Sequence, residues 1–325
     1  MITSCYRTSA GELRQDLPPD ALRDALADEH GLLWIDISTT SREEGEPVLA
    51  GIFGFHPLTI DDCYNDLVDP PKIDNYGTYL FTIVHDVDYD AASEQLTTQE
   101  LDLYIGPNYV VSFHKRPVRA AEEVLRRAEN HDRILGRGAG LLAHALIDVV
   151  VDDFHPVAEA IDDQVQAVQE QVIDRPERDI LQHVLRLKRN AQRLKRTILP
   201  QRDVANRLSR GEYALIPADA LIYFRDIYDH TVRVEEMIDT VRDLADSALN
   251  TYLSSVNNRL NEIMKALAVV TVVFLPMTLI TGVFGTNFEE TLPEYAWDYG
   301  FAAMFAMMLG VVIVLVLWLR ARRWF

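Results

Sequence analysis

ALAVVTVVFLPMTLITGVFGT, residues 266–286, contains no charged side chain, and YGFAAMFAMMLGVVIVLVLWL, residues 299–319, is a second such run. Each run is about twenty residues long, enough for a helix to cross a bilayer core of about 30 Å. Their position near the C-terminus argues against a signal peptide. Buried helices of a soluble domain are the alternative, but two such runs in tandem, followed by a basic tail, favour a hairpin of two membrane-spanning helices.

Charged residues around the two spans indicate their orientation. The linker at 287–298, NFEETLPEYAWD, carries acidic residues and no Lys or Arg, whereas Lys265 precedes the first span and a basic tail at 320–325 follows the second. Basic flanks remain in the cytoplasm. We therefore expect a multi-pass protein of the cell (inner or plasma) membrane, with the linker outside and both termini in the cytoplasm.

The acidic composition limits the classes of partner. Among 325 residues, 50 Asp and Glu outweigh 31 Lys and Arg, which gives a net charge of −19. Nucleic-acid binding needs a basic surface and is not expected. Acidity favours cations, although solubility or a salty habitat would explain it equally well. Cys5 and Cys63 have neither metal-ligand spacing nor the pattern of a disulfide framework.

Residues 1–117 have the pattern of an α/β domain. Apolar runs rich in β-branched and aromatic residues predict strands at 32–37, 78–84, 101–105 and 109–113. Gly106-Pro107-Asn108 is a turn sequence that would join the last two strands into a hairpin. Helical patterns fall between the first strands, so we expect an α+β cytosolic domain with a mixed sheet and helices.

The pattern becomes helical at residues 118–217, which we expect to form cytosolic helices. They are predicted at 118–135, at 141–173 with a kink at Pro156, and from Pro176 to 199, ending before Pro200. The segment 186–196 is densely basic. Acidic helices lie close to it in sequence, so a solvated or salt-bridged helix face is favoured over a nucleic-acid site.

The longest predicted element is a helix over 218–286 that includes the first span. No glycine or proline occurs between Pro217 and Pro276, and about sixty helical residues would measure about 90 Å. A rod of this length with one apolar stripe needs partners, so we expect oligomerisation about a shared axis. The stripe consists of Met237, Val241, Leu244, Ala248, Tyr252, Val256, Leu260, Met264 and Leu267.

Small and hydroxyl residues recur every seven positions in the first span. Met264, Thr271, Thr278 and Gly285 lie on one helical face, and Asn261 and Leu275 lie on the adjacent face. Such a face suits close helix packing, and it equally suits a narrow pore lined by several copies of the chain. Asn287 at the end of the span is either a helix cap or a neutral oxygen ligand for a hydrated cation.

Three acidic groupings in the soluble part could hold a hard cation such as Mg²⁺ or Ca²⁺. Like charges four residues apart on a helix repel each other unless a cation or a basic side chain lies between them. For each grouping, a solvated surface or an ion pair with Arg is the alternative. The groupings are Asp61 with Asp62, Asp148 with Asp152, and Asp226 with His230.

Several motifs occur together and in order along the chain. The strongest are YLSSV at 252–256, NEIMK at 261–265, FLPMT at 274–278 and GTNFE at 285–289, with FHPL at 55–58 and YFRDIYDH at 223–230 upstream. With these motifs the chain resembles the CorA family of divalent-cation channels over nearly its whole length. The resemblance implies a funnel-shaped homopentamer, embedded in lipid, whose long helix lines a pore.

The resemblance also implies passive Mg²⁺ influx, often with cobalt and nickel, and Mg²⁺ that is both cargo and regulator. It places the selectivity filter at Gly285, Thr286 and Asn287, and the pore lining at Asn261, Met264, Leu267, Thr271, Leu275 and Thr278. Met264 and Leu267 would form a hydrophobic gate. Asp62 of one subunit and Asp226 of the next would hold a regulatory Mg²⁺. Near a second cytosolic cation it places Asp61, Asp148, Asp152 and His230.

Two positions depart from the family pattern. The family signature is Gly-Met-Asn, but Thr286 is its middle residue here, and Asn250 stands where many members have an acidic residue. Two alternatives are therefore a zinc transporter of the related branch and a Mg²⁺-sensing membrane protein that does not conduct. An enzyme is not expected, because the chain has no phosphate-binding glycine loop, metal-hydrolase spacing or nucleophile elbow.

Overall fold

The computed structural model describes all residues except 66–67, 131–133, 175–177, 286–298 and 323–325. The chain divides into two compact units, Met1–Leu249 and Asn250–Phe325. The helix α8, Leu221–Phe284, contributes to both.

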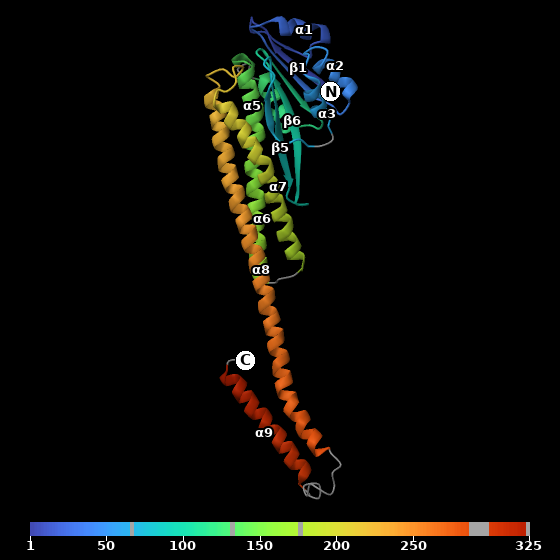
Figure 1. The fold of residues 1–325 in the computed structure, drawn as a ribbon, viewed down its shortest axis with the longest axis vertical. Coiled ribbons are helices and arrows are strands. Elements are labelled where there is room, and N and C mark those ends of the chain that lie inside the picture. The colour runs from blue at the N-terminus through green and yellow to red at the C-terminus, as the bar shows by residue number, and fades with distance from the viewer. Residues whose placement is uncertain (66–67, 131–133, 175–177, 286–298, 323–325) are drawn as a thin grey trace. The chain divides into compact units, whose positions relative to one another are not determined.

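The first unit contains a seven-stranded sheet in the order β2-β1-β3-β7-β6-β5-β4 (Figure 1). Only the β3–β7 pair is parallel, and the other strand pairs of this sheet are antiparallel, so the predicted mixed sheet is confirmed. The predicted turn at 106–108 joins β6 to β7, with the Gly106 amide donating to the Tyr109 carbonyl. The strands are β1 Ile2–Arg7, β2 Leu13–Gln15, β3 Leu32–Ser38, β4 Lys72–Asn75, β5 Leu80–Asp90, β6 Gln95–Ile105 and β7 Tyr109–His114.

Helices cover both faces of this sheet. On one face α1 (Pro19–Ala27), α2 (Arg42–Leu49) and α3 (Pro57–Tyr64) bury Phe81, Tyr104 and Phe113. On the other face α4 (Arg119–Asn130), α5 (Ala139–Asp152), α7 (Arg178–Ser209) and the start of α8 cover Trp34 and Leu103. Because β3 is buried on both faces, its first four residues, LLWI, form a continuous apolar run rather than an alternating one.

The predicted helix at 141–173 is two helices, α5 and α6 (Phe154–Asp174), separated by Asp153. Pro156 lies in the first turn of α6, where its missing N–H costs no hydrogen bond. The Asp153 carboxylate accepts a hydrogen bond from Arg119 Nε at 3.0 Å. The proline therefore marks the beginning of a helix rather than a kink within one.

The prediction that a helix ends before Pro200 is wrong, because α7 continues to Ser209. A proline inside a helix costs about 3 kcal/mol. Burial of Val204 and Leu208 after the proline offsets this cost, and Gln201 Oε1 accepts a hydrogen bond from the His85 amide at 2.8 Å. Tertiary packing thus overrides the local preference. Pro176, the predicted start of this helix, lies outside the described residues.

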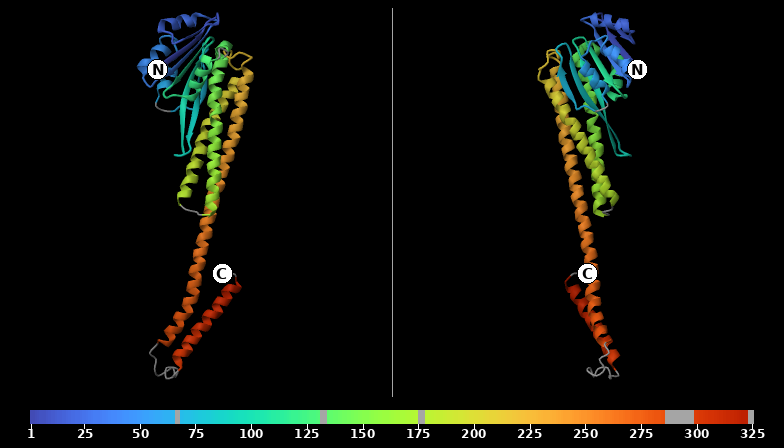
Figure 2. Two further views of the ribbon diagram at one scale, coloured as in Figure 1. Left: turned by 180° about the vertical axis from the view of Figure 1, so that it is seen from behind. Right: turned by 45° about the vertical axis from the view of Figure 1, so that its right-hand side comes forward.

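Arg186, Lys188 and Lys195 of α7 form ion pairs, in agreement with a solvated or salt-bridged helix face at 186–196. Arg186 pairs with Glu94 at 2.6 Å, and Lys195 pairs with Asp239 of α8 at 2.5 Å. In the first unit α8 lies beside α5–α7 in each view (Figure 2). Its buried residues are Phe224, Ile227, Thr231, Val234, Ile238, Val241, Ala245 and Ala248.

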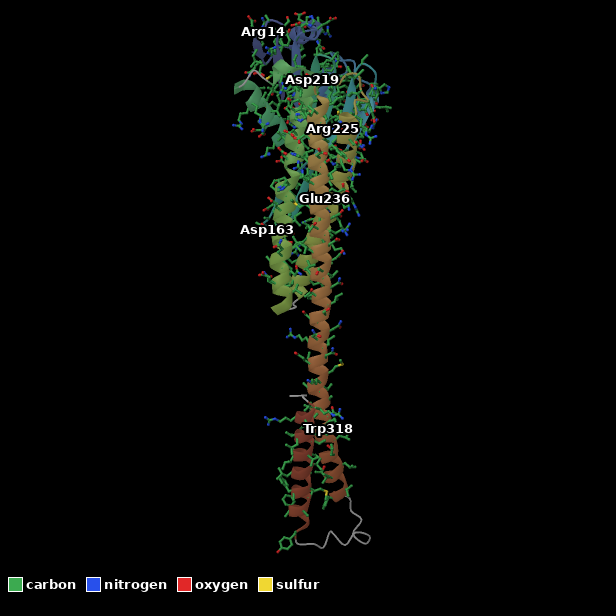
Figure 3. The ribbon with its side chains drawn as sticks, turned by 90° about the vertical axis from the view of Figure 1, so that its left-hand side faces the viewer. Arg14, Asp163, Asp219, Arg225, Glu236 and Trp318 are labelled. Atoms are coloured by element: carbon green, nitrogen blue, oxygen red, sulfur yellow. The ribbon has the colours of Figure 1, made fainter. Side chains whose placement is uncertain are left out.

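The predicted stripe and the observed stripe of α8 differ in part. Val241 and Ala248 are buried as expected, but Met237 and Leu244 are half-buried, and Ile238 and Ala245 take the deeper positions. The opposite face of α8 is solvent-exposed and includes Arg225 and Glu236 (Figure 3).

The second unit consists of the remainder of α8 and of α9, Gly300–Ala321. Both helices are long and apolar enough to cross a membrane. Their large side chains are exposed: Phe274 is 62% exposed, Leu275 67% and Phe301 74%. Exposed apolar surface on this scale is untenable in water. The two helices therefore fit the predicted spans.

Candidate cation sites and pore

Asp61 and Asp62 lie in the last turn of α3. His56 caps the start of this helix by accepting a hydrogen bond from the Leu58 amide, and Pro57 is its first residue. The negative end of the helix dipole disfavours carboxylates at this position, so each of them gains from a cationic partner.

Both carboxylates have such a partner within the chain. Asp62 Oδ2 lies 2.6 Å from Lys72 Nζ, and Asp61 Oδ1 lies 2.8 Å from Arg42 Nη2. Burial is the largest single effect on the pKa of Lys72 and lowers it, but the hydrogen bond to Asp62 and the negative charges of Asp62, Asp69 and Asp74 together leave the pKa above its usual value. The Lys72 side chain is therefore an ammonium ion at neutral pH. In this structure Asp61 forms an ion pair with Arg, as the alternative to a cation site supposes, and Asp62 forms one with Lys.

A second group of polar side chains lies between α5 and α8. His144, Asp148 and Asp152 follow one another at intervals of four on α5, and Asp226 and His230 lie on α8. His230 Nδ1 is 3.6 Å from Asp152 Oδ1, and His230 Nε2 is 3.8 Å from Asp226 Oδ2. His144 was not among the predicted site residues, although its spacing of four from Asp148 could have identified it.

Burial shifts two of these groups toward their neutral forms. It raises the pKa of Asp148, an effect that His144 opposes and Asp152 reinforces. It also lowers the pKa of His144, despite the nearby Asp148. A cation bound beside Asp148 would favour its charged form. Among the described residues, however, no three His, Cys, Asp or Glu side chains are arranged to hold a metal ion by themselves.

Asp62 and Asp226 are not brought together within one chain. Residues of α3 around Asp62 pack on the sheet face that carries Phe81, whereas those of α8 around Asp226 pack on the opposite face. The Asp226 side chain is 65% exposed. A site that uses both carboxylates therefore requires two subunits.

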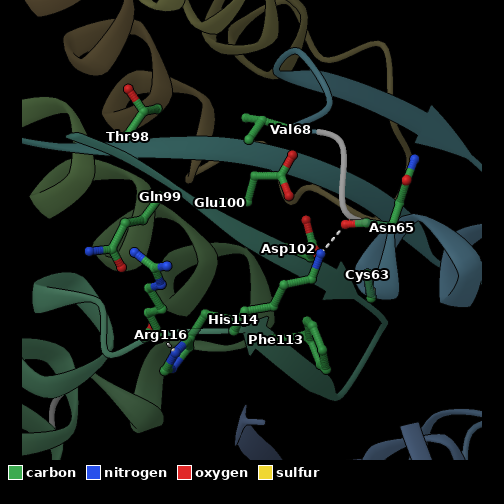
Figure 4. Close-up of a pocket in the computed structure, with 11 residues that line it drawn as sticks. Cys63, Asn65, Val68, Thr98, Gln99, Glu100, Asp102, Phe113, His114 and Arg116 are labelled. Atoms are coloured by element: carbon green, nitrogen blue, oxygen red, sulfur yellow. Dashed lines mark hydrogen bonds between the residues drawn. The ribbon is translucent and has the colours of Figure 1, made fainter. Parts of the chain in front are cut away.

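Two acidic residues of β6, Glu100 and Asp102, line a pocket of about 250 Å³ and were not among the predicted site residues (Figure 4). Asp102 is only 2% exposed and its Oδ1 atom has no hydrogen-bond partner. Burial raises the pKa of each to about 7. Lys115 and Arg116 line the same pocket and balance its charge. The sequence signal that could have identified this pocket is an acidic residue at an inward-facing position of an otherwise apolar strand.

The predicted pore residues share one face of α8. At 3.6 residues per turn, the six positions fall within an arc of about 120°. All six side chains are exposed in the single chain, with Met264 58% exposed and Leu267 65% exposed. The six residues, referred to below as the pore face, are Asn261, Met264, Leu267, Thr271, Leu275 and Thr278.

The hydroxyl groups of the pore face are held by the helix itself. Thr271 Oγ1 donates to the Leu267 carbonyl and Thr278 Oγ1 to the Phe274 carbonyl, both at 2.9 Å. These bonds use the only hydroxyl hydrogen and leave oxygen lone pairs on the exposed face. The pore face therefore offers neutral oxygen acceptors. Gly285 follows α8, and Thr286 and Asn287 lie outside the described residues.

Residues 13–323 of this sequence match the protein family CorA, which is described as CorA-like Mg²⁺ transporter protein. The chain belongs to this family. The cobalt/magnesium transport protein CorA of Thermotoga maritima is 34% identical over 292 residues, which cover 90% of this chain and 83% of that protein. A protein of the same name from Methanocaldococcus jannaschii is 24% identical over 303 residues, 91% of this chain and 92% of the relative.

Solved structures confirm the fold expected for a CorA-like protein. The complete CorA magnesium transporter from Methanocaldococcus jannaschii matches with a TM-score of 0.85 and 20% identity, covering 99% of this chain and 98% of that one. The ZntB cytoplasmic domain from Vibrio parahaemolyticus matches with a TM-score of 0.59 and 12% identity, covering 78% and 97%. Proteins of different names thus share the fold of the cytoplasmic part, and the fold alone does not decide which ion is carried. Family membership makes this chain a divalent-cation transporter of the membrane.

Proposed function

We propose that this chain forms a homopentameric channel through which Mg²⁺, and with it Co²⁺ and Ni²⁺, enters the cytoplasm passively. The observation that carries the proposal is the exposed pore face, a row of polar oxygen, thioether and leucine side chains along a helix that is apolar enough to span the membrane. Copies of α8 around one axis would enclose this face. The number five and the cytoplasmic position of both termini rest on the family resemblance and on the charge pattern.

Neutral oxygens along the pore suit a hydrated ion. Mg²⁺ gives up its water reluctantly, so carbonyl and hydroxyl oxygens would contact its outer shell rather than the ion itself. We assign the narrowest ring to Asn287, with Gly285 and Thr286 beside it. The acidic linker at 287–298 would raise the local cation concentration at the outer entrance.

Regulation would occur between subunits of the proposed ring. A cytosolic Mg²⁺ bridging Asp62 of one subunit and Asp226 of the next would hold the ring closed, because the ion prefers that state. A second ion would use the group at Asp148, Asp152 and His230, with Asp61 close by. When internal Mg²⁺ falls, the uncompensated carboxylates repel each other, and the apolar ring at Met264 and Leu267 opens to water.

Replacing either Asp62 or Asp226 by alanine is expected to weaken closure by internal Mg²⁺. Loss of one of two bridging carboxylates should raise the Mg²⁺ concentration needed for half-closure about tenfold, within the usual range of coupling between sites. Uptake into liposomes preloaded with graded Mg²⁺ measures this concentration. Asp219→Ala, which removes an exposed carboxylate just before α8, is the control. Unchanged sensitivity in both variants would contradict the proposed bridge.

The transport proposal itself is tested by uptake into liposomes that contain the purified chain. Mg²⁺ and Zn²⁺ are measured separately, with and without an imposed proton gradient. Mg²⁺ entry without a proton gradient, lost in Asn287→Ala, supports the channel. Proton-dependent Zn²⁺ uptake would assign the chain to the zinc branch. Absence of flux with either ion would leave a membrane-bound Mg²⁺ sensor.

A further inference from the structure

We propose that Lys72 is a built-in competitor for the cation site at Asp62, and that it sets both the affinity of that site and its restriction to divalent ions. The inference rests on the proposed function, because it concerns the carboxylate assigned to the regulatory Mg²⁺.

The geometry of the ion pair is fixed from both sides. Asp62 is held in the last turn of α3, and Lys72 is the first residue of β4, in register with Ile83 of β5. The Lys72 carbonyl accepts a hydrogen bond from Thr82 Oγ1 at 2.8 Å, and its ammonium group lies 5.8 Å from the centre of the Phe81 ring. The lysine therefore reaches Asp62 from an anchored strand rather than from a free surface position.

The pair is also partly shielded from water. The side chains of Asp62 and Lys72 are 27% and 35% exposed, whereas Asp226 is 65% exposed. The Nζ–Oδ2 distance of 2.6 Å is that of a short, charge-assisted hydrogen bond. A metal ion that binds Asp62 must therefore displace this ammonium group or share the carboxylate with it.

Charge decides which ions can do so. A monovalent cation that exchanges for the ammonium group gains nothing in charge, whereas a divalent ion brings twice the charge to the same carboxylate. A divalent ion that shares the carboxylate with Lys72 lies about 6 Å from its positive charge. Even at the dielectric constant of water, this repulsion weakens binding about tenfold.

This competition gives a low-affinity regulatory site from a half-buried carboxylate. With Lys72 in place, Asp62 would take up a divalent ion only when that ion is abundant. Without the lysine, the same carboxylate would remain occupied at a much lower Mg²⁺ concentration, and the closed state would persist.

The test is the Mg²⁺ dependence of protease protection in the full-length chain in detergent micelles. Lys72→Gln is expected to lower the Mg²⁺ concentration for half-protection about tenfold, and Lys72→Met to do the same while keeping the apolar stem over Phe81. Lys72→Arg, which retains the charge, should stay within about twofold of wild type. Thermal unfolding without Mg²⁺ establishes that each variant is folded, and protection is compared among folded variants.

Lys195→Gln is the matched control, because Lys195 also forms a part-buried ion pair, with Asp239, and its loss should not move the midpoint. An unchanged or higher midpoint in the folded Lys72 variants would overturn the inference. Failure of the proposed regulation looks different: protection of wild type and of Asp62→Ala would then have the same Mg²⁺ dependence, and both proposals would fall together.

Discussion

Leu267→Asn is expected to raise Mg²⁺ uptake at high internal Mg²⁺ by at least about tenfold, because a polar ring keeps a narrow pore wet where an apolar ring expels water. Leu267 is 65% exposed on the pore face of α8, one turn from Met264 and from Thr271. In the proposed pentamer, five leucines would meet at this level. Five carboxamides would instead supply hydrogen bonds to water in the closed state.

The measurement is uptake into liposomes loaded with Mg²⁺ at a concentration that closes the wild-type channel. Val273→Asn is the matched control, since Val273 lies on the side of α8 away from the pore face. It introduces the same polar group without entering the proposed pore and should leave the closed state tight. Equal leaks in the two variants would mean that a membrane defect, rather than a wet gate, carries the ion.

Asp102→Asn is expected to stabilise the first unit at pH 8 and to have little effect at pH 4. Burial raises the pKa of Asp102 from 3.8 to about 7, so the folded chain retains a proton that the unfolded chain has already lost. The stabilisation from this proton is complete below about pH 4 and disappears as the pH rises through about 7. At 1.36 kcal/mol per pKa unit, the free energy of unfolding falls by about 4 kcal/mol as this stabilisation is lost.

An asparagine at this position has no charge to bury, so the variant avoids that loss at every pH. Thermal unfolding of the full-length chain in detergent between pH 4 and pH 9 measures the difference in Tm between the variant and wild type. At pH values higher than 8 this difference should approach about 10 °C. A shallower pH dependence will remain, because burial also raises the pKa of Glu100 and Asp86 to about 7. Asp88→Asn, at an exposed position of β5, is the control. Parallel profiles for Asp102→Asn and wild type would contradict the prediction, because they would show that folding does not raise the pKa of Asp102.

Local patterns in the sequence determined much of the fold. The charge-free runs at 266–286 and 299–319 predicted the two apolar helices, because a membrane span is a property of one segment and its solvent. The absence of glycine and proline from 218 to 275 predicted the continuous α8. The strands β3, β5, β6 and β7 followed from short β-rich runs, and the family followed from motifs that are contiguous in sequence.

Features that depend on distant residues were not available from such patterns. Nothing local shows that α7 continues through Pro200, because packing against the sheet offsets the cost of the proline. Nothing local shows that Asp102 is buried beside Lys115. The sequence selected Asp62 and Asp226 as site residues, but only the structure places their helices on opposite faces of the sheet.

The partner of Asp62 is the clearest case. Its sequence neighbours identify the end of a helix and a candidate metal ligand. The ammonium group that lies 2.6 Å away belongs to Lys72, on the edge strand of the sheet. The sequence by itself determined which segments are helical, which are strands and which can enter a membrane, since periodicity and hydrophobicity act over a few neighbouring residues. Only the tertiary structure decided which charges are paired, because an ion pair depends on where the fold brings two segments together.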